Sequence, residues 1–125
     1  MTAEPVRLCR VQAADGRGPW RPGLSKYWID EDSDQPLQPD LITAFGLDWK
    51  KKIPSGWHAG CACRSFDGLF AWFTPTERRR LEGIGYQPIS FMADIIIAEN
   101  KDQVVFARRL PLHREIILHP WRKTA

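Results

Sequence analysis

Two β-rich runs on either side of a short polar turn most constrain how this 125-residue chain can fold. The first run covers residues 86–98, the second covers 103–109, and the polar residues 100–102 lie between them. This arrangement predicts a β-hairpin, because strand-forming side chains flank residues that favour a tight turn. The strand at 86–98 is long enough that we expect it to bend near Ala93 and Asp94.

Two short helices are expected just before the hairpin. Ser65 is placed to cap the first of them, whose apolar side chains recur at helical spacing: Phe66, Leu69, Phe70 and Phe73. Thr74 is placed to cap the second, with proline at its first position and Glu77 three residues after the cap, which is a capping-box pattern. This second helix is expected to end at two glycines, Gly83 and Gly85.

Further elements are expected along the rest of the chain: strands at 5–13, 57–64 and 115–118, and a short helix at 39–45. Runs of strands with helices clustered between them are typical of the α+β class. We therefore expect an α+β fold in which two or three short helices pack on a twisted, antiparallel-rich sheet.

A chain of this length is the size of a single compact domain, 1–125. We expect its folded core to span 5–118, with a long proline-rich and acidic loop at 14–38 and a tail at 119–125. The sequence contains neither an apolar run near the roughly 20 residues of a membrane span nor the pattern of a signal peptide. With three cysteines and no export signal, reduced thiols and a cytoplasmic location are the expectation.

Three polar positions form a pattern across the expected elements: Arg10 in the first strand, Ser65 before the first helix and Gln103 at the start of the late strand. In these positions the chain resembles ADP-ribosyltransferase-like domains, over roughly residues 5–109. The resemblance implies an NAD-binding fold in which Arg10 holds the phosphates or ribose, Ser65 positions the cleft, and Gln103 takes the place of the catalytic acid. It also implies NAD as the substrate and a macromolecule as the acceptor of ADP-ribose.

Gln103 departs from the family pattern, in which a glutamate takes this place. Breaking the nicotinamide–ribose bond develops positive charge on the ribose, which a carboxylate stabilises and a neutral amide does not. Glu99, four residues earlier across the turn, is the alternative source of a carboxylate. The expected activity is therefore either NAD-dependent ADP-ribosyl transfer or NAD binding by a catalytically degenerate descendant.

A segment rich in glycine and arginine, with a tryptophan, lies at 15–23, directly after the strand expected at 5–13. Arg17 and Arg21 are suited to phosphate, and Trp20 is suited to stacking on a base or a nicotinamide ring. Trp72, after the first helix, is a second candidate for stacking. We expect these residues to border the same cleft as Arg10; the alternative is an ordinary glycine and proline turn with solvated arginines.

A histidine and two cysteines lie close together in the sequence: His58, Cys61 and Cys63. Because zinc accepts imidazole and thiolate ligands, a metal site completed by Cys9 or His113 is one interpretation. The main expectation is that the thiols are buried core residues, since free cysteine is among the most buried residue types. A nucleophilic Cys63 is a further alternative, because the dipole of the following helix would lower its pKa.

Two other function classes fit the composition. A small chain with six tryptophans and a net charge of only +3 suits a non-enzymatic interaction module or a stoichiometric inhibitor, such as phage-encoded antagonists of bacterial defence. A nucleic-acid binder is less favoured. The arginines at 78–80 are consecutive, so they spread around a helix instead of facing one partner.

Overall fold

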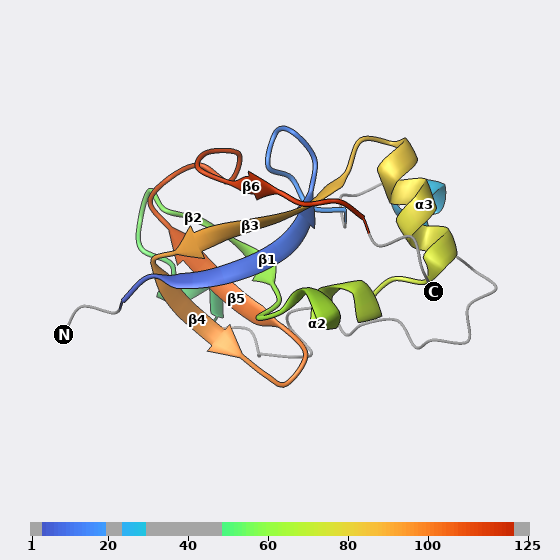
Figure 1. The fold of residues 1–125 in the computed structure, drawn as a ribbon. Coiled ribbons are helices and arrows are strands. Elements are labelled where there is room, and N and C mark those ends of the chain that lie inside the picture. The colour runs from blue at the N-terminus through green and yellow to red at the C-terminus, as the bar shows by residue number, and fades with distance from the viewer. Residues whose placement is uncertain (1–3, 20–23, 30–48, 122–125) are drawn as a thin grey trace.

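The computed structural model describes residues 4–19, 24–29 and 49–121 (Figure 1). The helix expected at 39–45 lies outside these residues, as do Trp20, Arg21 and most of the expected acidic loop.

Within the described residues, six strands form two antiparallel sheets of three strands each. The first sheet has the order β1-β3-β6, with β1 at Val6–Gln12, β3 at Gln87–Ala93 and β6 at Ile117–Leu118. The second has the order β2-β5-β4, with β2 at His58–Ala62, β5 at Val104–Arg108 and β4 at Ile95–Glu99. The described helices are α2 at Phe66–Ala71 and α3 at Pro75–Gly83, with single 3-10 turns at Ser25–Tyr27 and Trp49–Lys52. The α+β class is confirmed.

The single sheet and the single long strand expected at 86–98 are wrong, because the strand is shared between two sheets. The chain leaves the first sheet after Ala93, and the Asp94 backbone N–H donates to the Ala107 carbonyl of the second sheet at 3.1 Å. Ile95 then begins β4, which pairs with β5 in the predicted hairpin. The expected bend near Asp94 is thus the point where the chain changes sheets.

β1 is buried on both of its faces, which explains why its last five residues are all inaccessible. Leu8 on one face joins a core shared by the two sheets, together with Phe91 of β3 and Phe106 of β5. Cys9 and Val11 on the other face join a second core, formed with the helices and with Trp28, Tyr86 and Trp121. The first sheet is therefore a middle layer between the second sheet and the helices, and Figure 1 shows α2 and α3 gathered to one side of the strands.

Both helices begin at the predicted caps. The Ser65 Oγ accepts a hydrogen bond from the Gly68 backbone N–H at 3.1 Å. The Thr74 Oγ1 accepts from the Glu77 backbone N–H at 3.1 Å, and the Glu77 carboxylate accepts from the Thr74 backbone N–H at 2.8 Å. This reciprocal pair is the predicted capping box.

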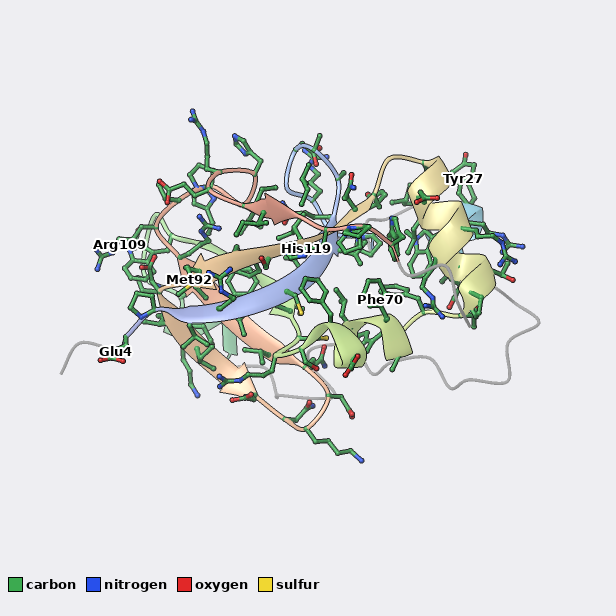
Figure 2. The ribbon with its side chains drawn as sticks, viewed as in Figure 1. Glu4, Tyr27, Phe70, Met92, Arg109 and His119 are labelled. Carbon is green, nitrogen blue, oxygen red and sulfur yellow. The ribbon has the colours of Figure 1, made fainter. Side chains whose placement is uncertain are left out.

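The expected tail at 119–125 is wrong for its first three residues. The His119 backbone N–H donates to the Pro88 carbonyl at 2.9 Å. Trp121 is only 7% exposed, its indole N–H donates to the Tyr86 carbonyl at 2.9 Å, and its ring packs edge-on against Phe70. Figure 2 shows Phe70 on α2. A large apolar side chain with a satisfied N–H is a core residue wherever it falls in the chain.

Among the described residues, no helix is both long enough and apolar enough to cross a membrane.

Candidate functional site

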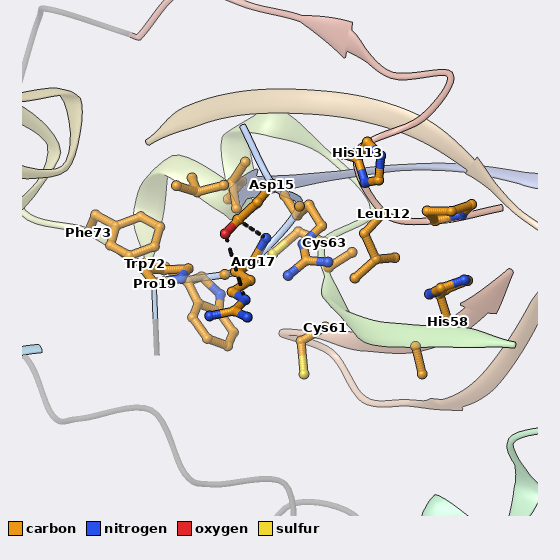
Figure 3. Close-up of a pocket in the computed structure, with 18 residues that line it drawn as sticks. Asp15, Arg17, Pro19, His58, Cys61, Cys63, Trp72, Phe73, Leu112 and His113 are labelled. Atoms are coloured by element: carbon orange, nitrogen blue, oxygen red, sulfur yellow. Dashed lines mark hydrogen bonds and ion pairs between the residues drawn. The ribbon is translucent and has the colours of Figure 1, made fainter. Parts of the chain in front are cut away.

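A pocket of about 630 Å³ opens where β1 and its following turn meet β2, the end of α2 and the segment after β5 (Figure 3). Its volume falls in the usual range for sites that take small molecules. Residues singled out from the sequence line it: Arg10, Arg17 and Trp72 from the expected cleft, and His58, Cys61, Cys63 and His113 from the metal interpretation.

Arg10 is the most unusual residue of the pocket, because its charged side chain is only 8% exposed. The Nε and Nη1 nitrogens are buried and have no hydrogen-bond partner among the described residues. The guanidinium lies over the Phe106 ring, with Cζ 5.7 Å from the ring centroid. A buried cation normally has a paired anion or a full set of hydrogen bonds, so a buried guanidinium with two unpartnered nitrogens is an exception.

Two glycines make the space for the Arg10 side chain. A Cβ on Gly60 of β2 would lie 2.8 Å from Nη1, and a Cβ on Gly18 would lie 2.9 Å from Nη2. Neither glycine has a positive φ, so it is space and not backbone conformation that favours glycine at both positions. The guanidinium is thus held between a strand and a turn that are far apart in the sequence.

Burial lowers the pKa of Arg10 to about 10, and the nearby Cys61 opposes part of that shift. The side chain therefore remains protonated at neutral pH, and its positive charge lies in the lining of the pocket. Desolvation is the dominant cause, which means that a bound anion would relieve an existing penalty.

Arg17 and Trp72 lie in the pocket as expected, but Arg17 is already paired. Its backbone N–H donates to the Asp15 carboxylate at 2.9 Å, and its Nε lies 3.7 Å from the same carboxylate. Both side chains are well exposed, so this ion pair is weak and easily rearranged. Asp15 is the only carboxylate among the described residues that line the pocket.

None of the three residues of the expected catalytic set lines the pocket. Ser65 is exposed and caps α2. Glu99 is exposed and accepts two hydrogen bonds from the Arg64 guanidinium, at 2.6 and 2.7 Å, which hold the pKa of its carboxyl below the ordinary value. Gln103 is 4% exposed, and its backbone N–H donates to the Asn100 side chain in the hairpin turn. The structure brings Arg10, Arg17 and Trp72 together and leaves these three apart from them.

Cys9 and Cys63 are core residues and Cys61 is half-buried, and the expected lowering of the Cys63 pKa is wrong. Burial, reinforced by the neighbouring Cys9, Cys61 and Asp102, raises the pKa of Cys63 to about 12. Burial also raises the pKa of Cys9 and of Cys61 to about 11. These thiols are protonated at neutral pH, so none has the character of a nucleophile.

The metal interpretation is not supported either. The part of the chain that the structure describes contains no group of three histidine, cysteine or acidic side chains placed to hold a metal ion. His58, Cys61 and Cys63 all line the pocket, but they are spread along β2 and the residue that follows it.

Sequence reasoning missed Gly60 and most of the segment at 111–113, of which it named only His113, as a possible metal ligand. The run of small residues at 59–62 is the signal for Gly60, because a strand without large side chains leaves room for a long one from its neighbour. The segment at 111–113 is fixed by contacts that the sequence does not reveal. The Gln12 side-chain amide donates to the Leu112 carbonyl at 2.8 Å, and Gly16 packs against the backbone of His113.

No protein-family model matches the chain, and no curated protein or solved structure is significantly similar to it. The resemblance to ADP-ribosyltransferase-like domains therefore depends on the residues of this chain alone.

Proposed function

We propose that the protein binds a phosphorylated nucleotide in the Arg10 pocket, with NAD as the ligand. The observation that carries the proposal is the buried Arg10 guanidinium, which has two nitrogens without partners beside a cavity of small-molecule size. Guanidinium is well matched to phosphate in geometry and keeps its charge, so a pyrophosphate is a suitable anion for it.

The surroundings of Arg10 support a nucleotide over a simple inorganic anion. The pocket is lined by Trp72 as well as by cations, and an indole offers a flat face to a base or a nicotinamide ring. Asp15 can accept a hydrogen bond from a ribose hydroxyl if Arg17 turns toward the phosphates. These groups serve binding and orientation.

We further propose that this ADP-ribosyltransferase-like domain is catalytically degenerate and binds NAD without transferring ADP-ribose. Transfer needs a carboxylate close to the ribose as positive charge develops there. Glu99 is engaged with Arg64, the position expected for the acid carries Gln103, and Asp15 already faces Arg17. A binding role makes fewer demands on these residues than a catalytic one.

Calorimetric titration with NAD tests the proposal, using the wild type, Arg10→Met and Arg79→Met. Methionine keeps much of the length and the apolar stem of arginine, so it removes the charge with little change in packing. Arg79 is exposed on α3, where its guanidinium bonds only the Thr76 hydroxyl among the described residues, and serves as the matched control.

Saturable binding in the wild type and in Arg79→Met, with at least about a tenfold loss in Arg10→Met, is the expected result. The absence of NAD binding by the folded wild type at millimolar concentration would overturn the proposal. Hydrolysis of NAD to nicotinamide by the wild type, measured by chromatography, would overturn the degenerate assignment while leaving binding intact.

A further inference from the structure

The pocket has two chemically different ends. Figure 3 places Trp72 and Phe73 at one end and His58 and His113 at the other, with Arg17, Cys61 and Cys63 between them. The first end is aromatic, and the second carries two imidazoles, with the apolar Leu112 drawn between them. A ligand that fills the whole pocket must match both ends.

The strand β2 and the residue after it run along the pocket, from the end that carries His58 toward its middle. His58 begins β2, and Cys63 lies five residues further along, immediately before the turn into α2. Five residues of extended chain span roughly 16 Å. Gly60, against which the Arg10 guanidinium lies, is in the middle of this strand, so the buried cation sits between the two ends.

The charges of the pocket lining favour a ligand with more than one negative group. Among the described residues, the lining contains two guanidiniums and two imidazoles against a single carboxylate, Asp15, which faces Arg17. Neither imidazole forms a hydrogen bond or ring contact with the described residues, so both are available as donors. Imidazole N–H groups bond phosphate oxygens well, and the charge of phosphate strengthens such bonds.

We infer that the ligand of this pocket is a nucleoside diphosphate unit, oriented with its base on Trp72, its first phosphate at Arg10 and its second phosphate between His58 and His113. This inference rests on the proposed function, and it adds the direction in which the ligand lies and the residues that recognise its second phosphate. NAD contains such a unit, as does free ADP.

Titration calorimetry with AMP and ADP tests the orientation, in parallel with NAD. The variants are His58→Asn and His113→Asn, alone and together, with His119→Asn as the matched control. His119 is the third and last histidine of the chain, and it lies outside the pocket with its Nε2 2.9 Å from the Ser90 hydroxyl. Trp72→Ala removes the proposed stacking face at the other end.

The wild type is expected to bind ADP at least about tenfold more tightly than AMP, because the second phosphate gains charge-assisted hydrogen bonds. The double histidine variant should lose this preference while its affinity for AMP stays within about twofold, and His119→Asn should match the wild type. Trp72→Ala should weaken AMP and ADP by the same factor.

Two outcomes overturn the inference in different ways. If NAD binds in an Arg10-dependent manner but the preference for ADP over AMP is absent or survives in the double histidine variant, the orientation is wrong and the proposed function stands. If none of the three nucleotides binds the folded wild type, the proposed function fails and the inference fails with it.

Discussion

The Nη1 nitrogen of Arg10 occupies the space where Gly60 would carry a side chain, since a Cβ at Gly60 would be 2.8 Å away. The two residues lie on adjacent elements of different sheets, β1 and β2. The Arg10 guanidinium therefore fits into the space that glycine leaves at position 60. No carboxylate among the described residues is paired with it.

Replacing Gly60 with alanine should disturb the Arg10 guanidinium more than any other feature of the pocket. Because Cζ of Arg10 and the Phe106 ring would also lie within 3.4 Å of the new methyl group, the side chain has to move. We expect at least about a tenfold loss of NAD affinity and a destabilisation of about 1–3 kcal/mol, measured by calorimetry and urea unfolding.

Gly83→Ala is the control for this experiment. Gly83 lies at the end of α3, and a Cβ there would meet nothing within 4 Å. We expect it to stabilise the fold by up to about 1 kcal/mol through helix propensity, with NAD affinity unchanged. Equal effects of Gly60→Ala and Gly83→Ala on NAD affinity would contradict the proposed role of the Arg10 guanidinium and of the space beside Gly60 that it fills.

Arg10→Met should leave the unliganded protein as stable as the wild type, or more stable. The native guanidinium is buried with two unpaired nitrogens, and its low pKa reports the penalty of that burial. We expect the free energy of unfolding in urea to change by between zero and about +3 kcal/mol. A loss of more than about 1 kcal/mol would show that the guanidinium is well satisfied in the folded state.

Stability should fall as the pH rises above about 9, because folded thiols hold their protons more tightly than unfolded ones. Burial raises the pKa of Cys9 from 9.0 to about 11. Its contribution is therefore complete below pH 9 and is lost as the pH approaches 11. In that interval each such thiol contributes a slope of up to about 1.4 kcal/mol per pH unit.

Urea unfolding of the wild type and Cys9→Ala at about pH 8, 9 and 10 measures this slope. We expect a shallower decline in Cys9→Ala, whatever its absolute stability. Above pH 10 the lowered pKa of Arg10 acts in the opposite direction, since the unfolded state then binds more protons at that group. Identical slopes in the two proteins below pH 10 would rule out a raised Cys9 pKa.

Trp121→Ala should destabilise the protein by about 3–5 kcal/mol, although the residue lies four positions from the end of the chain. The substitution removes a buried indole from the helical core and leaves the Tyr86 carbonyl without its donor. Ile117→Ala, at a side chain 52% exposed, should change the free energy of unfolding by less than about 1 kcal/mol. Similar thermal midpoints for the two variants would contradict the placement of Trp121.

Local chemistry allowed much of the fold to be predicted from the sequence. The caps at Ser65 and Thr74 and the hairpin turn at 100–102 depend on residues within a few positions of one another, and all three form as expected. The division of the strand at Asp94 could not be predicted, because it depends on which distant strands pair with each half. Trp121 was misassigned for the same reason, since its partners are Tyr86 and Phe70.

The candidate site was predicted less completely than the fold. Arg10, Arg17 and Trp72 are residue types that suit phosphate and ring binding wherever they occur, and the pocket contains all three. The space beside Gly60 that holds the Arg10 guanidinium, and the part of the pocket lining at 111–113, depend on contacts between segments that are far apart in the sequence. Such contacts leave no periodic signal in the chain.

The pairing of Val6 with Ala93 has a consequence for synthesis of the protein. A ribosome adds about 5–20 residues per second, so the first strand waits roughly 5 to 15 s before its partner strand has been made. During that time its backbone edge and the apolar side chains on both of its faces are unprotected. β1 is thus open to mispairing throughout this interval, and a chaperone that covers its edge until β3 has been made would protect it.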